Sequence, residues 1–357
     1  MNSSTSSSDL LEAGMIRRIT NNCYSPIIIA LVLSSSIETI AHICYDPATL
    51  GQTFAPRSRI PTPGESIVQS KLDFVYGGRN HVDLLIVGDS SGLMGVDTLR
   101  LQSATGMSAY NLCTVGFLGI DGHRYMLERY IDRHGIPDCV IYHVAPEVMF
   151  RDEQKIHEVG WLSRLKWHLG IDREWLPSLN YREHLQQWTT GGKPASVNNH
   201  NVTRGHWPSH NDVLSQLEEN KGSCEETVVT DWQSAPILTG DSSFQLAALK
   251  RLGDMSEEYG ISLYVICNPL PRIAVTPKNK ESLKALELAM TEALSSAENS
   301  RLFTPLFRYY DNDLCATLNH LHPTAIEANT DAIANWLGDH ASRPAMLIPN
   351  QPSTQQK

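Results

Sequence analysis

The sequence lacks the short motifs that usually mark nucleotide and nucleic-acid sites. It contains no Gly-x-x-x-x-Gly-Lys loop and no Gly-x-Gly-x-x-Gly turn, so a nucleotide cofactor has no support. It also has no run rich in Lys and Arg, and its net charge of −10 argues against general binding of nucleic acid. We therefore expect no cofactor and no nucleic-acid partner.

Cysteine is scarce and scattered. The seven cysteines form no Cys-x-x-Cys pair and do not indicate a zinc site. Cys113, Cys139 and Cys267 lie in apolar, strand-like contexts, where small buried thiols are expected. The odd count would leave one thiol unpaired even in an oxidising compartment. We predict no metal site from these residues.

What the chain does have is enough apolar sequence for a substantial core. With 357 residues, 41% of them hydrophobic, it is long enough for one large or two modest domains. Strand patterns alternate with helix patterns, which is typical of an α/β domain with a parallel sheet. After the first strand, the predicted elements are a helix over 123–134, strands over 137–142 and 261–267, and helices over 244–259 and 278–297.

The most informative stretch is an apolar run over 82–87 that ends in Gly88-Asp89-Ser90-Ser91. It predicts a buried strand whose carboxyl end presents Ser90. The segment from Leu93 to Leu101 predicts a helix, so Ser90 would lie where free backbone N–H groups favour a developing negative charge. The pattern is equally typical of a turn whose serine only caps a helix.

A histidine block over 314–325 lies far downstream and is followed by a helical pattern through Leu337. It offers two candidate bases, His320 and His322. A serine hydroxyl is a weak nucleophile until a neighbouring base accepts its proton. Serine and imidazole in one site would therefore indicate acyl transfer.

Together the two blocks resemble the SGNH (GDSL) hydrolase superfamily. The stretches 81–150 and 246–337 are similar to its membrane-anchored branch, which includes alginate O-acetyltransferase-like proteins of polysaccharide acylation. The resemblance implies a three-layer α/β/α fold with a parallel sheet and Ser90 as the nucleophile. The segment Tyr110–Gly116 resembles the second block of the family, which implies that the backbone N–H groups of Ser90 and Gly116 form the oxyanion hole.

The third block departs from the family pattern. It reads His143-Val144-Ala145-Pro146-Glu147 where Gly-x-Asn-Asp is usual, so the usual asparagine donor is missing. One oxyanion donor is worth about 3 to 4 kcal/mol, so another group must replace it or the chemistry is slow. His143 is a possible donor, although a histidine at a strand end is more often a hydrogen-bonded structural residue.

The last block departs as well, and two alignments of it stay open. His320 has Thr317 three residues before it, and His322 has Asn319 three residues before it; both positions usually carry aspartate. The residues upstream favour His320 as the base, with His322 as the alternative.

The missing aspartate matters because the acid fixes the histidine tautomer and stabilises the imidazolium. A backbone carbonyl, Asp311 or Asp313 is the candidate replacement. The alternative is a degenerate site that serves binding.

The N-terminal apolar segment allows three interpretations. It is a signal anchor with Arg17 and Arg18 inside, a cleaved secretory signal with small residues near 34–36, or an ordinary buried helix. Glu38 makes it a poor span, since a charge in mid-bilayer costs about 2.5 to 3.5 kcal/mol. The anchor is favoured, and it places the catalytic domain in the periplasm, with secretion as the alternative.

Six of the seven tryptophans fall between residues 151 and 241, which predicts an inserted subdomain. Its His200, His206 and His210 lack a nearby acidic cluster and are expected in solvated loops. The predicted organisation is a disordered tail (1–22), an anchor or signal (23–45), a linker (46–75), the first part of the SGNH-like domain (76–150), the Trp/His-rich insertion (151–241), the second part of the domain (242–340) and a flexible tail (341–357).

The sequence thus predicts a serine acyl-transfer enzyme of the SGNH type, an O-acetyltransferase or acetylesterase. Its expected partners are a cell-envelope or extracellular polysaccharide, an acyl-donor protein and, through the N-terminus, a membrane; the glycan is implied by the resemblance alone. Two alternatives stay open: a non-catalytic SGNH-like envelope protein that binds a polysaccharide or an assembly partner, and a cytoplasmic lipase-like esterase.

Overall fold

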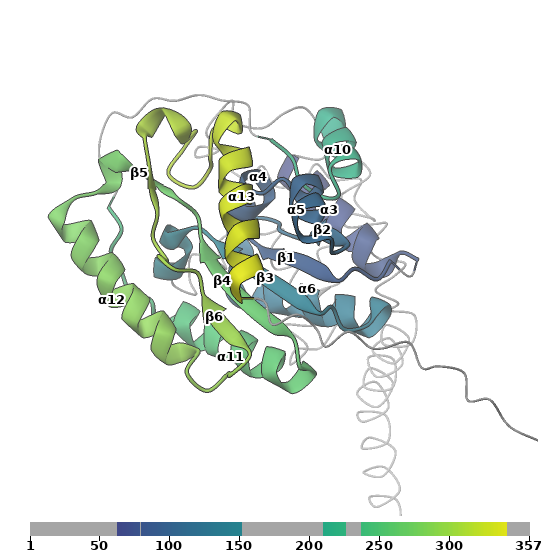
Figure 1. Cartoon of the computed structure of the whole chain (residues 1–357), viewed down its shortest axis with the longest axis horizontal. Helices are drawn as coiled ribbons and strands as arrows, with labels where there is room; N and C mark the ends of the chain where they lie inside the picture. The colour runs from purple at the N-terminus through teal and green to yellow at the C-terminus, as the bar shows by residue number, and fades with distance from the viewer. Residues whose placement is uncertain (1–62, 79, 152–209, 226–236, 341–357) are drawn as a thin grey trace, which may run out of the picture. The chain divides into compact units, whose positions relative to one another are not determined.

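Five parallel strands form the central sheet, in the order β2-β1-β3-β4-β6 (Figure 1). The computed structural model describes residues 63–78, 80–151, 210–225 and 237–340. Within them the strands are β1 (Leu84–Gly88), β2 (Ala109–Asn111), β3 (Cys139–Val144), β4 (Ser262–Cys267) and β6 (Ser300–Leu302). A second, two-stranded parallel sheet pairs β5 (Leu270–Pro271) with β7 (Tyr309–Tyr310).

Helices occupy the crossovers between these strands. The α-helices are α3 (Pro63–Tyr76), α4 (Ser90–Gly95), α5 (Thr98–Thr105), α6 (Gly119–His134), α10 (His210–Glu219), α11 (Ser243–Tyr259), α12 (Pro277–Ala293) and α13 (Pro323–His340). The short 3-10 turns are η2 (Gly116–Leu118), η3 (Pro146–Phe150), η4 (Arg272–Ala274) and η5 (Asn312–Leu314). The alternation of strand and helix that the sequence predicts is confirmed.

Helices cover both faces of the sheet. Successive strand residues point to opposite faces, so alternate residues of one strand pack into different cores. Leu85 and Val87 of β1 pack into one core with residues of α3, α6 and α11. Leu84 and Ile86 pack into the other with residues of α4, α5 and α13, the last of which crosses the sheet in Figure 1. Every residue of β1 and β3 is buried, as expected for parallel strands with helices on both faces.

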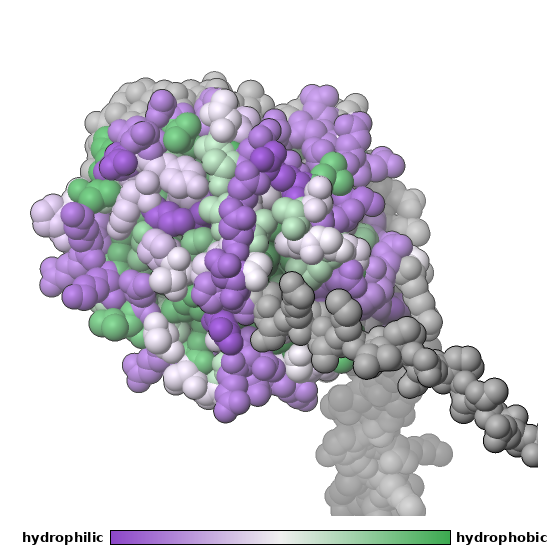
Figure 2. Space-filling model, in the orientation of Figure 1, coloured by the Kyte–Doolittle hydropathy of each residue, from purple (hydrophilic) through white to green (hydrophobic). Residues whose placement is uncertain are grey.

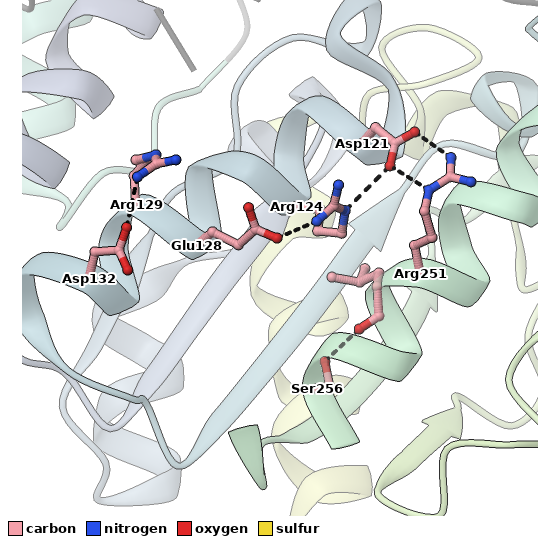
Figure 3. A network of polar contacts seen from close by, with 8 residues as sticks. Asp121, Arg124, Glu128, Arg129, Asp132, Arg251 and Ser256 are labelled. Atoms are coloured by element: carbon pink, nitrogen blue, oxygen red, sulfur yellow. Dashed lines mark hydrogen bonds and ion pairs between the residues drawn. The ribbon is translucent and has the colours of Figure 1, made fainter. Parts of the chain in front are cut away.

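Ion pairs lie on the outer surface of the helices. Asp121 of α6 accepts hydrogen bonds from Arg124 on its own helix and from Arg251 of α11, which joins the two helices (Figure 3). The Arg251 side chain is 46% exposed, so this pair adds little to stability. On the face drawn in Figure 2, hydrophilic residues cover the outward side of α13 and hydrophobic residues are scattered among them.

The strand order reverses at β1. The chain leaves β1 toward β2 on one side and later returns to β3 on the other side of β1. In open parallel sheets, a crevice forms at the carboxyl ends of the strands at such a point. Ser90 begins α4 one residue after the end of β1, with Asp89 between them, and therefore lies at this position.

Two predicted boundaries are wrong. A linker was expected over 46–75, but residues 63–76 form the helix α3. Its Ile67, Val68 and Leu72 are buried in the cores. The helix expected over 93–101 is two helices. The first, α4, ends at Gly95, and Asp97 caps the start of α5 by accepting a hydrogen bond from the Arg100 N–H.

Several predictions fall on residues outside the described ones. These are the N-terminal tail and anchor, the six tryptophans of the insertion with His200 and His206, and the C-terminal tail. Among the residues that the structure does describe, none of the helices combines the length and the apolar character that a membrane span requires. Five cysteines, at positions 113, 139, 224, 267 and 315, are buried free thiols.

A buried lysine ties α3 to the sheet edge. Lys71 is fully buried, and its Nζ donates hydrogen bonds to the carbonyls of Asn111, at 2.6 Å, and Gly222. The same Nζ lies 5.2 Å from the centroid of the Tyr110 ring. Burial lowers the pKa of Lys71 from 10.5 to about 7.

This lysine predicts a pH-dependent stability. Between the folded pKa of about 7 and the unfolded value of 10.5, the unfolded chain binds the extra proton, so the contribution of Lys71 to folding rises with pH. We expect Lys71→Met to lose on the order of 2 kcal/mol relative to wild type between pH 7.5 and 9.5. Urea unfolding at both pH values measures this. The exposed Lys250, paired with Asp254, supplies the control Lys250→Met, whose deficit should not change with pH. A constant deficit for Lys71→Met would contradict the prediction.

Candidate active site

Ser90 and His320 meet at the carboxyl end of β1. Ser90 begins α4, separated from the strand by Asp89 alone, and His320 lies in the loop between η5 and α13. The Nε2 atom of His320 is 2.8 Å from the Ser90 Oγ, although the two residues are 230 positions apart in the chain. This separation is that of a hydrogen bond between a hydroxyl and an imidazole.

The loop that carries His320 is closed by its own main chain. The Thr317 N–H donates to the His320 carbonyl at 3.2 Å, and the Thr317 hydroxyl accepts from the backbone N–H groups of Asn319 and His320. Leu321 is fully buried and pairs with Cys315 in an isolated β-bridge. Thr317 therefore shapes the backbone of the loop on which the imidazole is mounted.

The buried carboxylate of Asp89 holds the turn before Ser90. Its Oδ1 accepts from the backbone N–H of Ser91 at 2.8 Å and from the Ser91 hydroxyl at 2.5 Å. Its Oδ2 accepts from the Ala145 N–H at 2.8 Å, just beyond the end of β3. Burial raises the pKa of Asp89, while these three hydrogen bonds act in the opposite direction. One side chain thus joins the ends of two neighbouring strands.

His143 lies beneath the same turn. Its Nδ1 is 3.1 Å from the Ser91 Oγ, and its side chain is fully buried. Burial, together with the positive charge of Arg308, lowers the pKa of His143 to about 3, so the ring is neutral at neutral pH. A Cβ at Gly92 would lie 2.8 Å from the His143 Cβ, which is why α4 packs there with a glycine. The structure therefore places His143 as a buried support of the turn.

Gly116 lies beside the turn, as the resemblance implies for an oxyanion donor. It begins η2, and a Cβ built on it would be 3.6 Å from the Asp89 Cβ. Within the described part of the chain, the backbone hydrogen bonds include none donated by Ser90 or Gly116. Asn111 of the same block has a structural role, because its Nδ2 donates to the Gly92 carbonyl at 3.0 Å and so fastens α4 to the sheet edge.

The other candidates lie elsewhere. The Nδ1 of His322 is 2.8 Å from the Thr324 Oγ1, so this ring faces the start of α13. Asp311 pairs with Arg272 at 2.5 Å on the surface, and the Asp313 side chain is exposed. Of the two alignments that the sequence left open, the structure brings His320 to Ser90.

Sequence reasoning missed the role of Ser91. The doublet Ser90-Ser91 offers two hydroxyls, and nothing local tells which one faces solvent and which one is buried. The signal lies in the register, where Gly88 pairs with His143 across β1 and β3. That pairing brings the ring of His143 under the turn, and Ser91 bridges it to Asp89.

No family model, curated protein or solved structure matches this chain. The chemistry of the site is therefore inferred from its own residues. An alcohol, an imidazole at hydrogen-bond distance and two adjacent backbone amides are the parts that acyl transfer through serine uses.

The two N-cap aspartates provide a matched test of the Asp89 network. Asp89 caps α4 and also accepts from Ala145, whereas Asp97 caps α5. Both oxygens of Asp89 accept hydrogen bonds, so in Asp89→Asn the amide NH₂, itself a donor, replaces one acceptor and faces a donor of Ser91 or Ala145. We expect a loss of about 2 to 4 kcal/mol in the free energy of unfolding. Asp97→Asn should cost less than about 0.5 kcal/mol, because asparagine caps helices equally well. Chemical denaturation of both variants measures the difference; equal losses would show that the buried network contributes nothing beyond the cap.

Proposed function

We propose that the protein is a serine-dependent acyl-transfer enzyme of the SGNH type, an O-acetyltransferase or acetylesterase. The observation that carries this proposal is the 2.8 Å separation between the Ser90 Oγ and the His320 Nε2. Chance contacts of this kind are common, but here the pair lies at the reversal point of a parallel sheet. Gly116, whose amide the resemblance implies as an oxyanion donor, lies next to Asp89 at the start of the same turn.

The proposed reaction has two halves. The Ser90 Oγ attacks the carbonyl carbon of an acyl ester while the His320 Nε2 takes the hydroxyl proton. The resulting oxyanion is held by the N–H groups of Ser90 and Gly116. When the intermediate collapses, the ester C–O bond breaks and His320 returns the proton to the leaving alkoxide. In the second half, His320 takes a proton from water or a sugar hydroxyl as its oxygen attacks the acyl carbon; the bond from that carbon to the Ser90 Oγ then breaks, and His320 returns the proton to Ser90.

The substrate in this proposal is an acetylated polysaccharide of the cell envelope. Its support is the resemblance of the segments 81–150 and 246–337 to membrane-anchored proteins of polysaccharide O-acylation. The same resemblance supports a periplasmic site of action with the N-terminal segment as the anchor. Whether water or a glycan accepts the acyl group decides between esterase and transferase.

A second candidate function is a binding protein that keeps the fold without the chemistry. It is favoured by one observation: the positions three residues before His320 and His322 are Thr317 and Asn319, where the superfamily has an acid. The Thr317 hydroxyl bonds the backbone of the loop. In the binding protein, the crevice would hold a polysaccharide without cleaving it.

Covalent labelling by a fluorophosphonate probe separates the two functions. We expect labelling of the full chain that is abolished in Ser90→Ala, because only an activated serine hydroxyl attacks the probe. His320→Gln should slow labelling by about 100- to 10,000-fold, since it removes the general base.

His322→Gln is the matched control, because this ring contacts Thr324. It should label at a rate within about threefold of wild type, well short of the loss that removing a general base causes. Folded wild-type protein that does not label at all would favour the binding protein. Equal loss in both histidine variants would contradict the assignment of His320 as the base.

A further inference from the structure

We infer that Arg151 supplies the oxyanion donor that the third block lacks, and that its guanidinium, next to Gly116, stabilises the tetrahedral intermediate. This inference rests on the proposed function and assigns a further residue to the same site. It concerns a position that neither the sequence motifs nor the resemblance identified.

The location of Arg151 is the first argument. A Cβ built on Gly116 would lie 3.0 Å from the Arg151 Nη1 and 3.6 Å from the Asp89 Cβ. The guanidinium therefore lies against the residue whose amide is an expected oxyanion donor, on the edge that also carries the turn of Asp89 and Ser90. A side chain at position 116 would therefore crowd this nitrogen and require the guanidinium to shift.

The way Arg151 is held is the second argument. It follows directly after η3, the turn that occupies the place of the missing Gly-x-Asn-Asp block. Its Nη2 forms an ion pair with Glu147 one turn earlier, and its carbonyl accepts from the Gln245 Nε2 at 3.2 Å. Both ends of the residue are thus fixed. A donor fixed before the reaction needs no reorganisation when charge develops, which is the condition for oxyanion stabilisation.

The electrostatic setting is the third argument. The Arg151 side chain is only 22% exposed, so its charge is less screened than that of a surface arginine. Its positive charge reaches the turn: it is one of the influences that oppose the burial-driven rise in the pKa of Asp89. A guanidinium presents planar N–H donors in a fixed fork, a geometry that suits an anionic oxygen.

A second guanidinium near the network is a poorer candidate. Arg308 stacks over the Phe303 ring at 4.6 Å, and its nitrogens are buried. Its positive charge helps to lower the pKa of His143, which supports the turn from beneath. Arg308 thus acts on the buried side of Ser91, whereas Arg151 acts on the side of Gly116.

The test compares Arg151→Met and Arg151→Lys with Arg251→Met in the full chain, using p-nitrophenyl acetate and the fluorophosphonate probe. We expect Arg151→Met to lower kcat by about 100- to 1,000-fold with KM within about threefold, because the interaction exists only in the transition state. Arg151→Lys should keep part of the rate, since it keeps the charge and loses the planar donors. Arg251 is paired with an aspartate on the surface of α11, so Arg251→Met should match wild type.

Chemical rescue supplies a readout that a merely structural role would not move. Guanidinium ion at tens of millimolar should restore kcat of Arg151→Met by about tenfold or more, leaving the other variants unchanged. If Arg151→Met does not fold, as judged by circular dichroism and urea unfolding, the test uses two other variants. Arg151→Lys keeps the charge, and Glu147→Gln removes the ion pair that holds the guanidinium. The inference is overturned if the folded Arg151 and Glu147 variants keep kcat within about threefold of wild type while Ser90→Ala remains inactive. Wild-type protein that neither hydrolyses the ester nor labels would instead overturn the proposed function.

Discussion

The buried Asp89 carboxylate is the interaction on which the site depends. A carboxylate removed from water is costly unless each of its oxygens accepts hydrogen bonds. Here Ser91 satisfies one oxygen and the Ala145 N–H satisfies the other, so the ends of β1 and β3 are held together. Because Ser91 is drawn inward by Asp89 and His143, its neighbour Ser90 is left at the start of α4, turned toward His320.

The sheet topology explains why these residues meet. The strand order reverses at β1. The parallel strands β1, β2 and β3 have their carboxyl ends at the same edge of the sheet, so the segments that follow them all begin there. Ser90, Gly116 and Arg151 come from these three segments, and His320 arrives from the loop before α13. The polar parts of the site are therefore spread over the chain but rest on one parallel sheet, which suits the proposed acyl transfer, in which donors must be in place before charge develops.

Much of the fold could be predicted because the patterns that determine it are local. The buried strand before Gly88 and the helices that became α6, α11 and α12 follow from apolar periodicity, and the structure has them within a few residues. The helix α3 was missed because its apolar residues follow a proline- and glycine-bearing stretch that is typical of a linker. The break between α4 and α5 was missed because Asp97 caps a helix as well as it fits inside one.

For the site, the sequence by itself determined the residue types and the candidates: Ser90 after a strand, Gly116 in the second block and two histidines near the end. The residues upstream favoured His320, but the sequence could not settle the choice against His322, because both histidines lie in one short segment. Nor could it find Arg151, whose proposed role depends on its place next to Gly116 rather than on spacing. Tertiary structure decided which side chains meet, because hydrogen bonds and charge act over a few ångströms in space, whatever the distance along the chain.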